Sequence, residues 1–132
     1  VVEGYQAAEF SAGSRGLFYR SAFRVSPRSD RMGYRLEGNA VAAPAGERLS
    51  EGIAYGAVQV PLDGQPIVLL NDRQTIGGYP KLGTVLSLDC WKLAQCVPGA
   101  KVCFEVISLE AAQAAVEEFT ATREATALKR SA

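Results

Sequence analysis

The spacing of apolar and polar residues predicts a chain built largely from short strands. In the segment 53–60, Val58 and Val60 fall on one face and Gln59 falls on the other, as in a half-buried strand. Residues 67–70 are continuously apolar, which is typical of a strand buried on both faces. The predicted strands are SAFRV (21–25), YRLEG (34–38), IAYGAVQV (53–60), IVLL (67–70), LGTVLSL (82–88) and KVCFEVI (101–107).

Two shorter segments have the signals of helices. Residues 11–19 predict a short helix, although its glycines weaken the pattern. Residues 87–99 predict a second helix, with Ser87 as its cap, Asp89 in its first turn and Pro98-Gly99 as its stop.

A third helix is predicted at the C-terminal end, over residues 108–132. Apolar residues recur there at helical spacing, and we expect the tail from residue 125 to fray. The positions that share one face are Leu109, Ala112, Val116, Phe119 and Arg123.

Together these elements predict a mainly β fold. About six short strands separated by turns dominate the middle of the chain, and strands do not alternate with helices. We therefore expect one domain over residues 1–132, a closed or partly closed β-barrel with two or three peripheral helices. The chain starts Val-Val-Glu-Gly-Tyr, with no initiator methionine, and we expect it to be a piece of a longer protein.

Charge and residue types exclude several function classes. Fourteen basic and fourteen acidic residues cancel, so no net field favours nucleic acid or a membrane surface, and no apolar run is long enough to span a bilayer. The chain has no histidine, which excludes Ser-His-Asp triads and histidine-bound zinc. Acid–base chemistry would fall to Asp, Glu, Lys, Tyr or Cys.

The three cysteines have spacings that match no metal or redox motif. Cys90 and Cys96 fall in the second predicted helix and Cys103 in a predicted strand, so all three are interpreted as buried free thiols. An odd number of free cysteines fits a reducing compartment, and we expect a cytoplasmic protein. Trp91, in the middle of the same helix, is interpreted as a core anchor.

Three polar loops are candidates for a binding site, because loops between alternate strands gather at one rim of a barrel. Their side chains could bind a small polar or anionic ligand, since guanidinium forks bind carboxylates and carboxamides read amide edges. The candidates are Arg28, Ser29, Asp30, Arg31 and Arg35 in the first loop, Gln59, Asp63 and Gln65 in the second, and Asn71 to Pro80 in the third.

A structural interpretation of these loops stays open. Asp30 with Arg31, and Asp72 with Arg73, could simply cap loops and pair across the surface. Gly77-Gly78 could serve only to supply positive φ angles for a turn.

Three segments, residues 26–38, 56–87 and 91–108, resemble the C-terminal half of a bacterial protein family. Its members are variously labelled allophanate hydrolase subunit 2, the KipA-like antagonist of a kinase inhibitor, and the C subunit of 5-oxoprolinase. The segments are also similar to part of the urea carboxylase carboxyltransferase domain. The shared residues are Asp30 to Arg35, Gln59 to Pro61, Asp63 to Pro66, Asp72 to Thr75 and Gly77 to Pro80, with departures at Leu62, Asn71 and Ile76.

The resemblance implies a cyclophilin-like β-barrel that forms the C-terminal portion of a longer subunit. It also implies a companion protein, either KipI-like or the B subunit of 5-oxoprolinase. The chain has neither a GxxxxGK[ST] loop nor an Ala-Met-Lys-Met biotinylation site. We therefore expect no cofactor on this chain, with ATP or biotin acting through partner domains or subunits.

The function implied by the resemblance is substrate binding in an ATP-dependent amide or lactam enzyme, foremost one that converts 5-oxoproline to glutamate. The alternatives are a carboxyltransferase component of a urea carboxylase or allophanate hydrolase type of biotin enzyme, and a non-catalytic KipA-like regulatory module. The expected roles are anion binding by Arg31 and Arg73, positioning of Arg73 or base catalysis by Asp72, amide binding by Gln59 and Gln74, a pocket wall at Tyr79, and a tight turn at Gly77 and Gly78.

Overall fold

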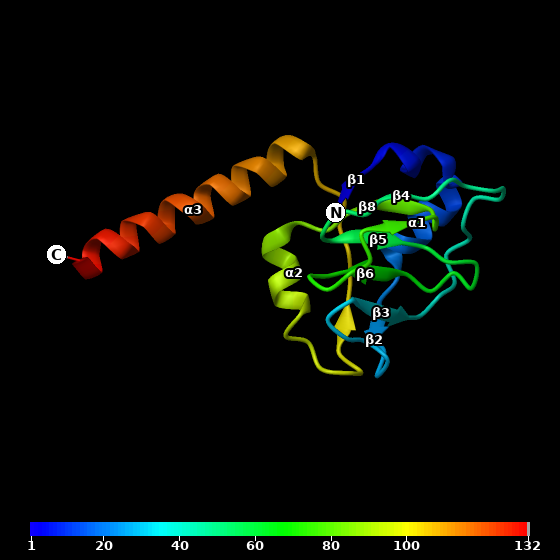
Figure 1. Cartoon of the computed structure of the whole chain (residues 1–132), viewed down its shortest axis with the longest axis horizontal. Coiled ribbons are helices and arrows are strands. Elements are labelled where there is room, and N and C mark those ends of the chain that lie inside the picture. The colour runs from blue at the N-terminus through cyan, green and yellow to red at the C-terminus, as the bar shows by residue number, and fades with distance from the viewer. Residues whose placement is uncertain (132) are drawn as a thin grey trace.

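A curled antiparallel sheet dominates the molecule (Figure 1). The computed structural model describes residues 1–131, with side chains described through residue 125, and within that range the sheet has seven strands in the order β1-β8-β5-β6-β3-β2-β9. The sheet curls (Figure 1), but its edge strands β1 and β9 do not pair with each other in the described range, so it forms a half-barrel rather than a closed barrel. Its strands are β1 (Val2–Glu3), β2 (Phe23–Val25), β3 (Gly33–Glu37), β5 (Ala57–Gln59), β6 (Ile67–Leu69), β8 (Lys81–Thr84) and β9 (Lys101–Val102).

The remaining elements lie around this sheet. A separate two-stranded ribbon is formed by β4 (Glu51–Gly52) and β7 (Ile76–Gly77). The helices of the described range are the 3-10 helix η1 (Tyr5–Glu9) and the α-helices α1 (Ala12–Arg20), α2 (Ser87–Leu93) and α3 (Leu109–Ser131). The predicted mainly β fold with peripheral helices is confirmed.

One face of the sheet carries the main hydrophobic core. Leu36 of β3, Val58 of β5 and Val68 of β6 are fully buried there, against Phe18 of α1 and Leu93 of α2. The alternation of β-strand side chains sends the intervening residues to the other face. Burial of this core face therefore determines which residues are left for the opposite one.

The opposite face has a small apolar cluster of its own, Ile53, Ala57 and Leu69, with Ile67 packed against it. The Ile53 N–H donates to the Thr75 carbonyl at 2.9 Å within the ribbon, and the Ile53 side chain attaches the ribbon to this side by packing against Ala57 and Leu69. The second face is therefore covered in part and left open in part.

Several predicted strands are shorter in the structure. The strand expected over 53–60 spans only Ala57–Gln59, because the chain turns at Gly56, where φ is +85°. The strands expected over 82–88 and 101–107 are Lys81–Thr84 and Lys101–Val102. The two-residue strands β1, β4 and β7 and the helix η1 were not predicted, since such short pieces carry no readable periodicity.

Helix α2 differs from its prediction at both ends. Leu86 occupies the N-cap position and no side chain caps the helix, so the expected cap at Ser87 was wrong. The helix ends at Leu93, well before Pro98-Gly99. The chain tightens there into i→i+3 hydrogen bonds, such as Cys96 N–H to the Leu93 carbonyl at 2.9 Å.

Helix α3 extends away from the sheet (Figure 1). The Ser108 hydroxyl caps it by accepting from Ala111 N–H at 3.1 Å. Trp91 is 47% exposed and meets Phe119 edge to face at 5.5 Å, so the prediction of a core tryptophan was wrong. The helix continues through Ser131 where fraying was expected, and Ala132 lies outside the described residues. No helix in the described range could cross a bilayer.

Of the three free thiols, only that of Cys90 is buried. Burial raises its pKa to about 11, with a smaller contribution from the Asp89 carboxylate. Cys96 is half-buried and Cys103 is exposed, so the expectation of three buried thiols was wrong for these two. Strand β9 ends at Val102, before Cys103 could be paired into the sheet.

The predicted Asp-Gly turn between β5 and β6 is confirmed. Asp63 Oδ1 accepts from Gln65 N–H at 3.0 Å, and the Gln65 carboxamide pairs with both backbone groups of Gly38. Gly64 has a φ of +74°, and a Cβ there would lie 2.9 Å from backbone atoms of Val41. Only glycine fits this position without strain.

Replacing Gly64 with alanine should therefore lower the free energy of unfolding by about 1–3 kcal/mol. Gly52→Ala is the matched control, because a Cβ at Gly52 meets nothing within 4 Å, and it should change stability by less than about 0.5 kcal/mol. Urea denaturation of both variants measures the difference. Equal effects of the two substitutions would contradict the role given to Gly64.

Candidate functional site

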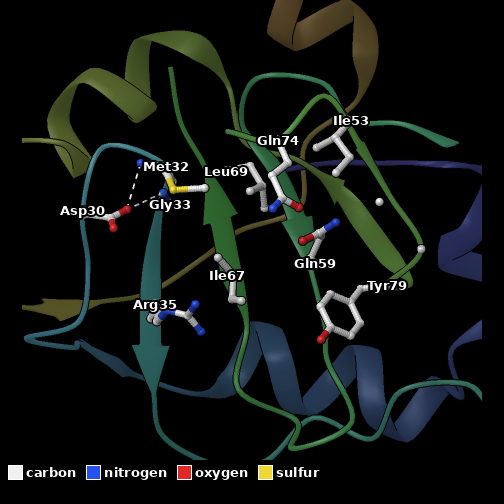
Figure 2. A pocket seen from close by; sticks show the side chains of 12 residues that line it. Asp30, Met32, Gly33, Arg35, Ile53, Gln59, Ile67, Leu69, Gln74 and Tyr79 are labelled. Carbon is white, nitrogen blue, oxygen red and sulfur yellow. Dashed lines mark hydrogen bonds between the residues drawn. The ribbon is translucent and has the colours of Figure 1, made fainter. Parts of the chain in front are cut away.

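A pocket of about 430 Å³ opens on the second face of the sheet (Figure 2). Strands β3, β5 and β6 form its floor, and the ribbon with the segment after β7 forms its opposite wall. We call it the glutamine pocket. Its lining residues are Asp30, Met32, Gly33, Arg35, Ile53, Gln59, Ile67, Leu69, Gln74, Gly77, Gly78 and Tyr79.

The floor of the glutamine pocket follows directly from strand register. Arg35 pairs with Ile67 across β3 and β6, and Ile67 pairs with Gln59 across β6 and β5. Directly paired residues of antiparallel strands share a face, so a guanidinium, an aliphatic side chain and a carboxamide form one row. Gly33 pairs with Leu69 one step further along. A side chain at Gly33 would meet Ile67 at 3.0 Å, so glycine keeps the floor open.

Gln59 is the most unusual residue of the site. It is only 5% exposed, and its carboxamide has no hydrogen-bond partner among the described residues. A Cβ at Gly77 would lie 3.2 Å from Gln59 Nε2, so the glycine makes room for the carboxamide. Figure 2 shows the carboxamides of Gln59 and Gln74 directed toward each other inside the pocket. Among the described residues, the fully buried side-chain atoms without a partner are Arg15 Nε and Arg48 Nε, so the Gln59 amide is open to the pocket, where a ligand with an amide edge would pair with it.

Arg35 brings a positive charge to the other end of the row. The Ser29 hydroxyl holds its backbone, accepting from Arg35 N–H at 3.0 Å and donating to the Arg35 carbonyl at 3.2 Å. The guanidinium itself has no acceptor within the described part of the chain, and it points toward Ile67 in Figure 2. It is therefore free to bind an anionic group.

The rim next to Arg35 is a folded loop. Asp30 Oδ1 accepts from Met32 N–H at 2.9 Å and from Gly33 N–H at 3.3 Å, which closes the turn. The Arg31 carbonyl accepts from Asp72 N–H at 3.0 Å, joining this loop to the one after β6. The Asp30 carboxylate thus caps its loop, as the structural interpretation of the sequence allowed.

Arg73 lies outside the glutamine pocket, contrary to its expected role as an anion binder. Its Nε donates to the Ile53 carbonyl at 3.0 Å and its Nη1 to the Leu70 carbonyl at 3.4 Å, while the guanidinium lies 5.9 Å from the centre of the Tyr55 ring. Arg73 fastens the ribbon to the sheet. Two of its five N–H donors are used by backbone carbonyls, and the spacing of the motif alone could not show this.

Arg31 and Asp72 also lie outside the pocket, and both are exposed. In the described range no ion pair joins Asp72 to Arg73, so the expected positioning of Arg73 by Asp72 was wrong. Of the seven predicted site residues, the structure brings Gln59, Gln74, Gly78 and Tyr79 together. Two sequence patterns had indicated these residues: the alternation of apolar and polar positions around Gln59, and the polar loop from Asn71 to Pro80.

Gly77 and Gly78 do not have the positive φ angles considered for them. Gly77 belongs to β7 and pairs with Glu51 of β4.

The Glu51 carboxylate binds the Lys81 ammonium at 2.8 Å and accepts from the Tyr5 hydroxyl, and these contacts hold its pKa below the ordinary value. This stabilisation is present above the ordinary carboxyl pKa and is lost as pH falls through the lowered one.

The comparisons with known proteins agree with this fold. Two curated relatives, each named as the C subunit of 5-oxoprolinase, come from Escherichia coli and Haemophilus influenzae. Each is 43% identical, over 85% and 82% of this chain respectively. The chain spans 36% and 35% of their lengths. A solved structure titled TTHA0988 matches 79% of the chain and 20% of its own, with a TM-score of 0.69 and 39% identity.

The urea amidolyase structure from Kluyveromyces lactis shares the fold. It matches over 86% of this chain and 8% of its own, with a TM-score of 0.76 at 22% identity. The family model for the carboxyltransferase domain, subdomain A and B, matches residues 1–106. The chain therefore belongs to the carboxyltransferase domain family, subdomain A and B.

Proposed function

We propose that the chain supplies the substrate-binding surface of an ATP-dependent enzyme that opens 5-oxoproline to glutamate. The observation that carries this proposal is the carboxamide of Gln59, which faces the pocket beside Gln74 and has no protein partner among the described residues. A carboxamide offers one acceptor and two donors, and a lactam presents its carbonyl and its N–H on the same edge. The two groups are complementary.

The rest of the pocket suits the other parts of 5-oxoproline. Ile67 and Leu69 offer an apolar surface to the ring methylenes. Arg35, in the same row as Gln59, is placed to bind the carboxylate with its planar fork. We therefore assign anion binding to Arg35 rather than to Arg31 or Arg73, and we assign Tyr79 to the wall.

The names of the two curated relatives support this reading, because each is a 5-oxoprolinase subunit. Since the chain spans about a third of their length, we propose that it works within a longer subunit. Its companion would be a KipI-like protein or the B subunit of 5-oxoprolinase. The free cysteines fit a cytoplasmic enzyme.

The pocket residues do not fit the triphosphate of ATP. Gly77 and Gly78 lead into β8, a strand, so the glycines are not followed by the helix N-terminus that a phosphate-binding loop requires. We propose that ATP, or biotin in the alternative below, acts through partner domains or subunits. What this chain contributes is binding, orientation and partial exclusion of water.

A carboxyltransferase acting on urea is the second candidate function. The family model describes a carboxyltransferase domain, and the glutamine pair would bind the amide edge of urea as well as that of a lactam. Arg35 separates the two functions, because urea has no carboxylate for a guanidinium to bind. In a non-catalytic KipA-like regulatory module, neither substrate would be turned over.

In the reconstituted multi-subunit enzyme, Gln59→Met should lower kcat/KM for 5-oxoproline by about 10- to 100-fold, because one or two hydrogen bonds to the amide are lost. Arg35→Gln should lower it by a similar factor. Gln95→Met, an exposed position outside the pocket, is the control and should leave activity unchanged. The assay is ATP-dependent release of glutamate, with urea carboxylation measured in parallel.

Unchanged turnover in both pocket variants would overturn the assignment. Urea carboxylation that depends on Gln59 and is indifferent to Arg35 would favour the second candidate. Absence of both activities in the wild-type assembly would favour the regulatory module.

The same substitution also tests whether the Gln59 carboxamide is free of protein partners. Gln59→Met should change the free energy of unfolding of the chain by less than about 1 kcal/mol, since the carboxamide has no protein partner to lose among the described residues. Gln95→Met should change it by less than about 0.5 kcal/mol. Chemical denaturation monitored by circular dichroism measures both, and a clear loss of stability in Gln59→Met would indicate that the carboxamide has a structural partner.

A further inference from the structure

A second pocket of about 200 Å³ adjoins the glutamine pocket and shares three residues with it, Arg35, Ile67 and Tyr79. Its walls are unusually rich in charge. Besides Arg35, it is lined by Arg28, Glu37 and Asp63, and we call it the charged pocket.

The fold brings these four charges together from three segments. Arg35 and Glu37 lie two residues apart on β3, so they share the face that also carries the floor of the glutamine pocket. Arg28 comes from the loop before β3, and Asp63 from the turn between β5 and β6. The two pockets therefore lie in sequence along one face of the sheet.

None of these four side chains is neutralised by another. Within the described residues there is no ion pair that involves Arg28, Arg35, Glu37 or Asp63. Only Asp63 is engaged, since its Oδ1 accepts from Gln65 N–H at 3.0 Å. Two guanidiniums and two carboxylates line one small pocket without pairing, and this arrangement is complementary to a ligand that carries both signs of charge.

We propose that the charged pocket binds the α-carboxylate and α-ammonium groups of a free amino acid, while its side-chain carboxyl or amide extends past Ile67 and Tyr79 toward the glutamine pair. This inference rests on the proposed function and names a second ligand of the same site, the ring-opened product. A simple anion such as phosphate fits less well, because Glu37 and Asp63 would repel it.

The two forms of the ligand differ at both ends of the amide bond that opens, since hydrolysis leaves a second carboxylate on the carbonyl carbon and an amino group on the other side. In 5-oxoproline the nitrogen is part of a neutral amide, whereas in glutamate it is an ammonium. The guanidiniums serve the α-carboxylate of both forms. Only the open form of the ligand offers Glu37 a cationic group, so Glu37 is the residue that distinguishes product from substrate.

The test measures binding of L-glutamate and 5-oxoproline to the 132-residue chain by amide chemical-shift titration, with N-acetyl-L-glutamate and inorganic phosphate as further probes. Glu37→Gln should weaken glutamate binding about tenfold and change 5-oxoproline binding by less than about twofold. Arg35→Gln should weaken both. Glu110→Gln, exposed on α3, is the matched control and should weaken neither.

N-acetyl-L-glutamate, which lacks the ammonium, should bind wild-type chain about tenfold more weakly than glutamate. This comparison needs no variant, so it decides the matter even if Glu37→Gln fails to fold. Equal binding of the two compounds, equal effects of Glu37→Gln on both ligands, tighter binding of phosphate, or no binding of glutamate would each overturn the inference. If glutamate binding depends on Glu37 but 5-oxoproline does not bind, the proposed function fails and the amino-acid site stands.

Discussion

The register of three antiparallel strands is the constraint on which the rest of the structure depends. Pairing of β3 with β6 and of β6 with β5 places Arg35, Ile67 and Gln59 in one row. The neighbouring residues along these strands alternate to the other face, where Val58 and Val68 are fully buried in the main core. A slip of one residue would exchange the two faces, and the free energy of core burial prevents it. The packing of the core thus sets the geometry of the site.

The second face is completed by an element that contributes little to stability by itself. A two-residue ribbon would not persist alone. It is held by the Arg73 guanidinium, which reaches the carbonyls of Ile53 and Leu70, and by Glu51, which binds Lys81. These contacts bring Gly77 close to Gln59 without giving the carboxamide a partner among the described residues. The fold therefore leaves an amide without a protein partner facing the pocket, as expected where a residue is kept for function rather than for stability.

The parts of the fold that depend on local pattern could be predicted from the sequence. Alternation placed Gln59 opposite Val58 and Val60, and the Asp-Gly turn at Gly64 followed from its residue types. The direction of a loop side chain could not be predicted. Arg73 stands in a polar loop, and only the distant Ile53 carbonyl decides that it points away from the pocket. Likewise, the sequence could not show that Trp91 is exposed, because Trp91 packs against Phe119 of helix α3, which extends away from the sheet.

The central claim is that a ligand with an amide edge binds along the row from Arg35 to Gln59. The most direct measurement is a set of nuclear Overhauser contacts between 5-oxoproline and the isotope-labelled chain. The account predicts contacts from the ring methylenes to the methyl groups of Ile67 and from the lactam N–H to the side-chain amide of Gln59. Contacts confined to the loop of Asp72 and Arg73, or to α3, would contradict it.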